Sequence, residues 1–424
     1  MARISPFAAL RFNETLSGES KAICCPPYDI IPVERQNELE AENPYNVIRL
    51  ERPLGQDRYR RAGALLRRWC DDGVLKRDSC PAYYVYRLEF EDGGTRRSLH
   101  GFFARVGLEP FSSGVIMPHE ETISKDKSDR YSLMEQTLCN ISPVYGLYEG
   151  GGRYPDEALR RIINGALPDV SFTDGDSVTH SLWVVSDPGI QESLTGALAD
   201  KRILIADGHH RYETALAFFG DRKNRKEGMP KESPCGTVLM FLADIHHPDL
   251  VVWPTHRLVR EIEGFRWENL VSALEAEFQV ATRPYNPGIP ALLSKMPRTI
   301  GLYMGGDAVT LLTLKDPDAV RRRLPDKSDA YCSLEVSMLH ACILEPHLGI
   351  GREKLAAGSH IDYTRDIGEA HAKVRAGACR CAFLLPPTDV GMIGRVADQG
   401  ERMPQKSTYF HPKLTTGLVI HPLY

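Results

Sequence analysis

One segment constrains the fold more than any other: within residues 203–219 an apolar run, a turn and a helix start follow one another. The run Ile203–Ala206 is apolar throughout, as expected for a buried strand. Asp207 and Gly208 then predict a turn, and the apolar spacing over Arg211–Phe219 predicts a helix. A strand that leads directly into a helix is typical of proteins that mix the two.

The rest of the chain alternates strand-like and helix-like segments in the same way, without an internal repeat. The turn Asp92-Gly93-Gly94 predicts a hairpin, and from Glu261 onward a second set of elements begins. We therefore expect a mixed α/β (α+β) fold with two units, residues 1–262 and 263–424. The predicted helices are 58–70, 156–163, 211–219, 267–277, 334–344 and 389–399, and the predicted strands are 83–90, 96–106, 181–186, 203–206, 237–243, 250–253, 299–304, 309–313 and 382–385.

The composition excludes several classes of protein. The 424 residues include 52 Lys and Arg against 56 Asp and Glu, a net charge of −4, so no global positive field favours nucleic acid. The basic stretch at residues 221–231 is interpreted as a solvated loop, and a local anion or nucleic-acid patch is the alternative. No apolar run reaches the length of about 18 residues that a membrane span needs, and the first residues do not resemble a secretory signal. We therefore expect a cytoplasmic protein without a membrane partner, and nucleic acid is not the expected ligand.

The turn that follows the strand at 203–206 is the strongest candidate for a site. The first N–H groups of a helix have no partner inside the helix, and together with the helix dipole they attract anions. Imidazole and guanidinium groups at this place predict a phosphate site, with Asp207 orienting a histidine or holding a divalent ion. Two alternatives stay open: Asp207 only caps the helix, or His209 and Glu213 hold zinc. The predicted phosphate ligands are Gly208, His209, His210 and Arg211.

A second group of polar residues follows Pro118. Its His-Glu pair suggests a zinc protease, but that motif needs a second histidine where Ile123 stands. Without a zinc motif, the segment still combines a base, several cations and a carboxylate within a dozen residues. Such a combination can polarise a hydroxyl and bind a charged substrate. The alternative is a solvated charged loop. The residues concerned are His119, Glu120, Lys125, Lys127, Asp129 and Arg130.

Three further segments combine polar residues with a turn. His256-Arg257 lies at the end of a strand, Lys406–Lys413 lies near the C-terminus, and Tyr28-Asp29 follows two prolines. Each supplies phosphate or carboxylate contacts in one interpretation and is only a structural turn in the other. The usual nucleotide, dinucleotide, hydrolase and protein-kinase motifs are absent from the sequence.

Six segments spread over the whole chain carry a family resemblance. They are CPPYDII (25–31), PHEETISKDKSDRYSL (118–133), SPVYGLY (142–148), ADGHHRYETAL (206–216), PTHRLV (254–259) and MPQKSTYFHPKLTTGLVIHPL (403–423). Together they resemble a widespread microbial family catalogued as a domain of unknown function and sometimes labelled ParB-like. The element at 207–211 is also similar to the phosphate-contacting box of the ParB/sulfiredoxin superfamily, which implies a ParB/sulfiredoxin-like phosphate-binding core.

Within that superfamily the box of the free serine kinases is nearest to Asp207–Arg211. Sulfiredoxin has a catalytic cysteine in its box, and this chain has none there. The DNA-binding relatives continue with a helix-turn-helix region, whereas this chain continues with predicted strands. The resemblance therefore favours small-molecule chemistry over DNA binding.

These observations lead to a functional hypothesis. We expect a phosphotransferase that acts on a small hydroxy metabolite, free L-serine or phosphoserine, with ATP, ADP, CTP or pyrophosphate as donor and Mg²⁺ as helper. The expected catalytic residues are Glu120 as base, His119 beside it, Asp207 as metal ligand, and His210. Lys127 and Arg130 are expected at the phosphates, and Asp29, His256, Arg257 and Lys413 at the substrate.

Two other classes of function stay open. A ParB-like, nucleotide-gated DNA-binding protein would bind nucleotide and DNA and would form a clamp-like dimer. A metal-dependent hydrolase would remove phosphate from phosphoserine or a similar phosphoester with water as acceptor. Homodimerisation is left open by the sequence.

Overall fold

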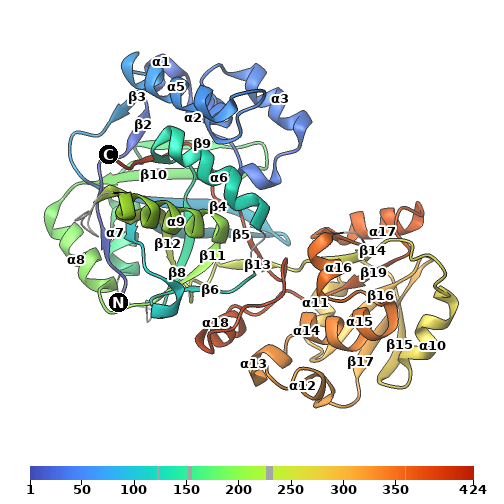
Figure 1. Cartoon of the computed structure of the whole chain (residues 1–424). Coiled ribbons are helices and arrows are strands. Elements are labelled where there is room, and N and C mark those ends of the chain that lie inside the picture. The colour runs from blue at the N-terminus through green and yellow to red at the C-terminus, as the bar shows by residue number, and fades with distance from the viewer. Residues whose placement is uncertain (122–123, 151–154, 226–232, 359) are drawn as a thin grey trace. The chain divides into compact units, whose positions relative to one another are not determined.

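The structure is a computed structural model that describes residues 1–121, 124–150, 155–225, 233–358 and 360–424. Of residues 124–127, 225, 352, 356 and 357 it describes the backbone alone. The chain divides into two compact units (Figure 1). The first contains Met1–Pro118, Thr122–Val251 and Pro412–Tyr424, and the second contains His119–Glu121 and Val252–His411.

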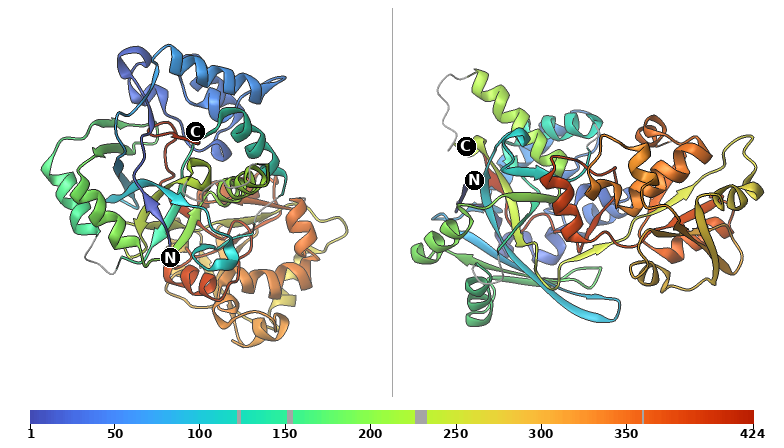
Figure 2. Two further views of the ribbon diagram at one scale, coloured as in Figure 1. Left: turned by 60° about the vertical axis from the view of Figure 1, so that its left-hand side comes forward. Right: turned by 90° about the horizontal axis from the view of Figure 1, so that it is seen from below.

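The chain passes into the second unit at Val252, whereas the sequence places the boundary near residue 262. The difference has a structural reason, because the strand β14 (His256–Val259) pairs with β18 and β19 of the second unit's sheet. The chain returns to the first unit with Pro412–Tyr424, so both termini belong to that unit (Figure 2).

A mixed sheet of nine strands forms the centre of the first unit, with the order β6-β11-β8-β12-β5-β4-β10-β9 and with β1 paired to β5. β11 runs parallel to β6 and β12 runs parallel to β8, while the other pairs are antiparallel. The strands are β1 (Ile4–Ser5), β4 (Tyr83–Asp92), β5 (Thr95–Gly107), β6 (Ile116–Pro118), β8 (Val144–Tyr148), β9 (Val170–Thr173), β10 (Thr179–Val185), β11 (Ile203–Asp207) and β12 (Thr237–Asp244).

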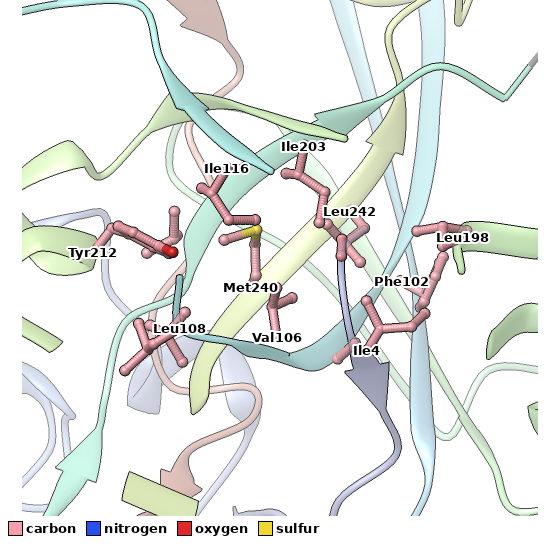
Figure 3. Close-up of a cluster of buried hydrophobic side chains, with 14 of the residues drawn as sticks. Ile4, Phe102, Val106, Leu108, Ile116, Leu198, Ile203, Tyr212, Met240 and Leu242 are labelled. Atoms are coloured by element: carbon pink, nitrogen blue, oxygen red, sulfur yellow. The ribbon is translucent and has the colours of Figure 1, made fainter. Parts of the chain in front are cut away.

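The core of the first unit lies between this sheet and its helices. Every residue of β12 is buried, as expected for a central strand covered on both faces. The helix α9 (His209–Arg225) contacts β8 and β12, and α6 (Ser124–Thr137) lies beside α9 and α5 (Arg58–Asp71) (Figures 1 and 2). Figure 3 shows part of the cluster, in which Ile116, Ile203, Tyr212, Met240 and Leu242 come from four different elements. Burial of one such aliphatic side chain contributes about 1.5–3 kcal/mol to stability.

A second, smaller core of the first unit packs the N-terminal helices against α5 and α6. Trp69 of α5 is its largest buried side chain, and the rings of Phe12 and Tyr45 contact it edge-on at 5.7 and 5.9 Å. The other helices of this unit are α1 (Glu14–Ser17), α2 (Ser20–Ile23), η1 (Tyr28–Ile30), α3 (Val33–Glu42), α4 (Ile48–Glu51), η2 (Phe111–Ser113), α7 (Asp156–Gly165), α8 (Pro188–Leu198) and η3 (Pro234–Gly236). Two small strand pairs complete it, β2 (Leu10–Phe12) with β3 (Leu75–Arg77) and β7 (Cys139–Asn140) with β21 (His421–Pro422).

The second unit contains an antiparallel sheet of six strands in the order β15-β17-β16-β19-β14-β18. The remaining strands of this sheet are β15 (Phe278–Pro284), β16 (Thr299–Tyr303), β17 (Ala308–Leu314), β18 (Ile361–Thr364) and β19 (Cys381–Leu384), and β13 (Val251–Trp253) pairs with β20 (Tyr409–His411). Its helices are η4 (Trp267–Asn269), α10 (Leu270–Leu274), α11 (Ile289–Leu293), α12 (Ala319–Arg323), α13 (Asp329–Cys332), α14 (Glu335–Leu339), η5 (His340–Leu344), α15 (Glu345–Leu348), α16 (Arg352–Ala357), α17 (Ile367–Arg375) and α18 (Val390–Asp398).

The predicted mixed α/β class is confirmed, and the predicted hairpin 83–106 is the pair β4–β5. Two details differ. The helix expected at 211–219 runs from His209 to Arg225, so it includes the first residues of the expected basic loop. The predicted helix 334–344 continues from α14 into a π-helical turn, η5. In the described part of the chain, no helix is long and apolar enough to cross a membrane.

Candidate functional site

Gly208 makes the turn between β11 and α9. It adopts φ +88°, in the left-handed region, and α9 begins at the next residue. The N–H of Tyr212 donates to the carbonyl of Gly208 at 3.0 Å, which closes the first turn of the helix. His209 is buried and His210 is half-buried at this helix start. The predicted strand, turn and helix are therefore confirmed, and the amides that lack a helical partner lie directly after Asp207.

We expect Gly208→Ala to destabilise the protein by about 1–3 kcal/mol. An alanine Cβ would lie 2.9 Å from Nε of Arg211, and φ +88° is unfavourable for any residue with a side chain. Urea unfolding followed by circular dichroism measures the effect. Gly220→Ala is the matched control inside α9, because its Cβ meets nothing within 4 Å and alanine favours a helix by about 0.5–1 kcal/mol. Equal stabilities of the two variants would show that the turn is not strained.

Asp207 holds two cations at this turn. Nη2 of Arg211 donates to Oδ2 of Asp207 at 2.6 Å, and Nζ of Lys413 donates to Oδ1. Burial raises the pKa of the Asp207 carboxyl, but the fields of Lys413 and Arg211 outweigh it and hold that pKa well below its ordinary value. Asp207 therefore does more than cap the helix, and it fixes the position of both cations. Arg211 also donates from Nη1 to the carbonyl of Pro143.

The same contacts test the predicted metal site. Both carboxylate oxygens of Asp207 are bonded to cations, which does not fit direct coordination of Mg²⁺. A divalent ion would have to displace Lys413 or Arg211 from the carboxylate. We therefore assign no chemical step to a metal at Asp207.

A buried network lies next to this turn. The guanidinium of Arg130 donates to Oε1 of Glu51 at 3.2 Å and to Oδ2 of Asp129, and it lies 4.0 Å from the ring centroid of Tyr28. The hydroxyl of Ser142 donates to the same oxygen of Glu51 at 2.7 Å. Glu51 is 1% exposed, and burial raises its pKa although the field of Arg130 lowers it. Arg130, predicted as a phosphate ligand, thus has two carboxylate partners in this structure.

The network and the Asp207 turn share one small cavity of about 30 Å³. Glu51, Arg130, Ser142 and Arg211 all line it. Burial lowers the pKa of Arg211, but the negative charge of Asp207 raises it, and Asp29 and Glu51 add smaller contributions in the same direction, so this pKa lies above its ordinary value. The charge of Asp29 thus acts on Arg211. Sequence analysis missed Glu51 and Ser142, because neither stands in a pattern that distinguishes it from other polar residues.

His119 and Glu120 belong to the second unit, where they meet the segment 403–408. The ring of His119 is fully buried, and its Nε2 lies 2.7 Å from Oγ1 of Thr408. The N–H of Met403 donates to the carbonyl of His119 at 2.7 Å, and the N–H of Lys406 donates to Oε1 of Glu120. Nε2 of His119 and Oε2 of Glu120 are 3.9 Å apart. Two segments that the sequence singled out separately thus hold each other in place.

His256 and Arg257 lie on β14 and point to opposite faces of the second unit's sheet, as neighbours on a strand do. Nδ1 of His256 accepts from the N–H of Leu385 at 3.2 Å, and burial lowers the pKa of His256 to about 4, so its ring is neutral at pH 7. Arg257 is 1% exposed, and its guanidinium contacts the ring of Tyr363, 5.4 Å from the centroid. A buried arginine at this place was not foreseen from the sequence.

The predicted site residues therefore fall into two groups. Asp207, Gly208, Arg211 and Lys413 meet in the first unit with Asp29 close to Arg211, whereas His119, Glu120, His256 and Arg257 lie in the second. The side chain of Lys127 lies outside the described residues, as do residues 226–231 of the basic stretch. Whether the two groups act together stays a prediction.

The first unit also contains a chain of hydrogen bonds that the sequence did not reveal. Oδ1 of Asp156 lies 2.6 Å from Nε2 of His100, Nδ1 of His100 lies 2.9 Å from Nε2 of His247, and Nδ1 of His247 accepts from the N–H of Asp249. One choice of tautomers satisfies all these groups. Among the residues that the structure describes, His100, Asp156 and His247 are the one group of three close enough to share a metal ion. His209 and Glu213 are not part of it.

Comparisons with known proteins give one match by sequence. The family described as "Protein of unknown function (DUF1015)" matches residues 4–337. No curated protein matches. The predicted resemblance to a family of unknown function is confirmed.

Several solved structures are similar to this chain at low TM-scores. A conserved hypothetical protein from Pyrococcus furiosus has 12% identity and a TM-score of 0.33, with 74% of this chain and 94% of that chain covered. A free serine kinase in complex with AMP has 12% identity and a TM-score of 0.35, with coverages of 74% and 91%. SbnI with a C-terminal truncation, from Staphylococcus aureus, has 13% identity and a TM-score of 0.36, with coverages of 76% and 87%.

Proposed function

We propose that this chain, which belongs to the protein family of unknown function DUF1015, transfers a phosphoryl group between a phosphate donor and the hydroxyl of a small metabolite. The observation that carries the proposal is the pair of cations, Arg211 and Lys413, held on Asp207 at the start of α9. Asp207 thus fixes two cationic groups beside the helix amides and the positive end of the helix dipole, where each can contact a phosphate oxygen. Phosphoryl transfer depends chiefly on such positioning and charge compensation.

Free L-serine is the proposed acceptor, with ATP, ADP, CTP or pyrophosphate as the donor. The similarity of Asp207–Arg211 to the box of the free serine kinases supports this choice. The serine hydroxyl oxygen bonds to the terminal phosphorus of the donor, the bond from that phosphorus to the leaving oxygen breaks, and the hydroxyl proton passes to a base. Phosphoserine is the substrate of the reverse reaction.

Glu120 is the proposed base. The N–H of Lys406 holds one of its oxygens, and Nε2 of His119 lies 3.9 Å from the other, so the carboxylate has a fixed orientation. His210 is proposed as a further catalytic residue because it stands in the first turn of α9. Gly208, His209, Arg211, Lys127 and Arg130 are the proposed phosphate ligands, and Asp29, His256, Arg257 and Lys413 the proposed substrate ligands.

Phosphorus NMR of the purified chain tests the proposal. Mixtures contain L-serine, Mg²⁺ and one donor each: ATP, ADP, CTP or pyrophosphate. We expect a phosphoserine resonance with one donor, and a rate at least about 100-fold lower in Glu120→Gln and His210→Ala. Two controls match these variants: Glu38→Gln and His246→Ala change exposed residues of the same types outside the site and should leave the rate unchanged.

Other outcomes would replace the proposal. If no donor is consumed in any mixture, phosphoryl transfer to serine is wrong. Release of inorganic phosphate from added phosphoserine would support a phosphatase instead. Nucleotide binding that is accompanied by DNA binding, without turnover, would support the ParB-like alternative.

A further inference from the structure

The second unit contains a cavity that the proposed function does not use. Its volume is about 620 Å³, within the range of about 300–1,000 Å³ typical of small-molecule sites. The lining comes from Glu121, from residues between 323 and 355 on α12–α16 with η5, from β18 and from the segment 404–405, all within the second unit. Apolar side chains form much of the wall, among them Leu324, Tyr331, Ile350, Leu355 and Tyr363.

Two polar atoms of this wall are buried without a hydrogen-bond partner among the described residues. They are Oγ of Ser337, on α14, and Nε2 of His340, at the start of the π-helical turn η5. Ser337 is 1% exposed. Burial lowers the pKa of His340 to about 3, so its ring is neutral at pH 7. A buried hydroxyl and a buried ring nitrogen without partners indicate a place for a polar ligand group, since native proteins satisfy such atoms almost everywhere else. π-Helical turns are also frequent at functional sites.

Arg257 lies against the same wall. Its ring partner Tyr363 and its acceptor Gln405, whose carbonyl is 3.4 Å from Nη2, both line the cavity. Nη1 donates to the carbonyl of Thr255, and Nε has no partner in the part of the chain that the structure describes. Burial lowers the pKa of Arg257 to about 10, so the group is still a cation at pH 7.

Arg257 therefore differs from the other buried cations of the chain. Arg130 and Arg211 each have a carboxylate within 3.2 Å, whereas no carboxylate of the described residues forms an ion pair with Arg257. Burial of a charge is costly unless the charge is paired. Glu120 favours the charged form of Arg257 from beyond ion-pair distance, and the place in direct contact with the guanidinium suits an anion.

The charges around the opening indicate which anion fits. Four carboxylates line the cavity, from Glu121, Asp326, Glu345 and Glu353. The two cations of the lining already have partners, because Arg323 pairs with Glu277 at 2.7 Å and Lys327 lies 3.9 Å from Glu401. A phosphate dianion would be repelled by this acidic rim twice as strongly as a carboxylate. The apolar wall in turn favours an organic body on the ligand.

We propose that this cavity binds a carboxylic acid with an apolar body, its carboxylate held by Arg257, Ser337 and His340. Arg257 is also a proposed substrate ligand of the phosphoryl transfer, so the two proposals share this residue. The site still goes beyond that reaction, because the wall of the cavity suits a larger and more apolar molecule than serine. Binding at this site does not require turnover, so it can be measured whether or not the chain transfers phosphate.

Isothermal titration calorimetry with the full chain tests the proposal, with phenylpropionate and octanoate as carboxylate probes. We expect both to bind, and we expect phenylpropionamide, which has the same body without the charge, to bind at least tenfold more weakly. Phenylphosphonate and inorganic phosphate are the phosphate-type probes and should bind more weakly than the carboxylates. Tighter binding of either would replace the carboxylate in the proposal by a phosphate group.

Variants connect the binding to the named residues. Arg257→Met should lower the affinity for phenylpropionate at least tenfold without lowering the melting temperature, because the buried charge that it removes has no carboxylate of the described residues in ion-pair contact. Ser337→Ala should lower the affinity several-fold. Arg260→Met is the matched control, since Arg260 follows β14 in an exposed pair with Asp362 and should leave the affinity unchanged.

The outcomes separate this site from the proposed function. Absence of carboxylate binding to the wild-type chain, or equal binding by a folded Arg257→Met variant, overturns the proposal. Phosphoserine formation without carboxylate binding would leave only the proposed function standing. Carboxylate binding without donor consumption would leave only this site standing.

Discussion

Asp207→Asn should lower the free energy of unfolding by about 3–5 kcal/mol at pH 7, the cost of breaking a buried ion pair from one side. The variant leaves Arg211 and Lys413 largely buried without the carboxylate that both contact. An amide supplies one acceptor oxygen but no negative charge. Urea unfolding measures the change, and Asp200→Asn is the control, because Asp200 is exposed and its loss should change stability by less than about 0.5 kcal/mol.

The dependence on pH distinguishes an ion pair from a packing effect in this experiment. The pKa of the Asp207 carboxyl in the folded protein lies below its ordinary value. The stability that its charge contributes is therefore complete above the pKa of about 3.9 that the carboxyl has in the unfolded chain. This stability is lost as the pH falls below that value toward the pKa of the folded protein. The stability difference between wild type and Asp207→Asn should therefore shrink by about 1 kcal/mol between pH 5 and pH 3. A difference that stays constant over this range would mean that the charge of Asp207 does not stabilise the fold.

The turn at Gly208 could be predicted because its signals are local. A buried strand, an Asp-Gly pair and the helix that follows are contiguous in the sequence, and α9 differs from expectation only in its bounds. The pairing of Lys413 with Asp207 joins residues far apart in the chain, and no local pattern indicates it. Lys413 could be named as a site residue, but its partner could not.

The buried charges outside that turn were beyond sequence analysis for the same reason. Glu51 stands in a helix of four residues, too short for a periodic pattern to show which of its side chains are buried. Arg257 follows His256 on a strand whose residues are all buried. Alternation of polar and apolar residues along such a strand therefore does not show whether a charged side chain is buried or exposed. Burial of a charge depends on elements that other parts of the chain place around it.

Glu51→Gln should lower the free energy of unfolding by about 3 kcal/mol, the lower end of the cost of breaking a buried pair. It removes the charge that faces Arg130 and changes the acceptor of Ser142, while Arg130 keeps its contact with Asp129. Urea unfolding at pH 7 measures this loss of stability. Glu38→Gln is the control: Glu38 belongs to an exposed ion pair on α3, and its replacement should change the free energy of unfolding by less than about 0.5 kcal/mol.

A double-mutant cycle with Arg130→Met shows whether this cost belongs to the pair. We expect the Glu51→Gln/Arg130→Met variant to be more stable than the sum of the single changes predicts, with a coupling of about 1–3 kcal/mol. Additive effects would show that the two side chains stabilise the fold independently. Arg257 differs from Arg130 in its contacts. Arg130→Met leaves the buried Glu51 carboxylate without its cation and should destabilise the fold. Arg257→Met removes a buried cation that has no carboxylate within ion-pair distance among the described residues and should not. A loss of stability in Arg130→Met, with none in Arg257→Met, would show that Arg130 stabilises the fold through its carboxylate partners and that Arg257 does not.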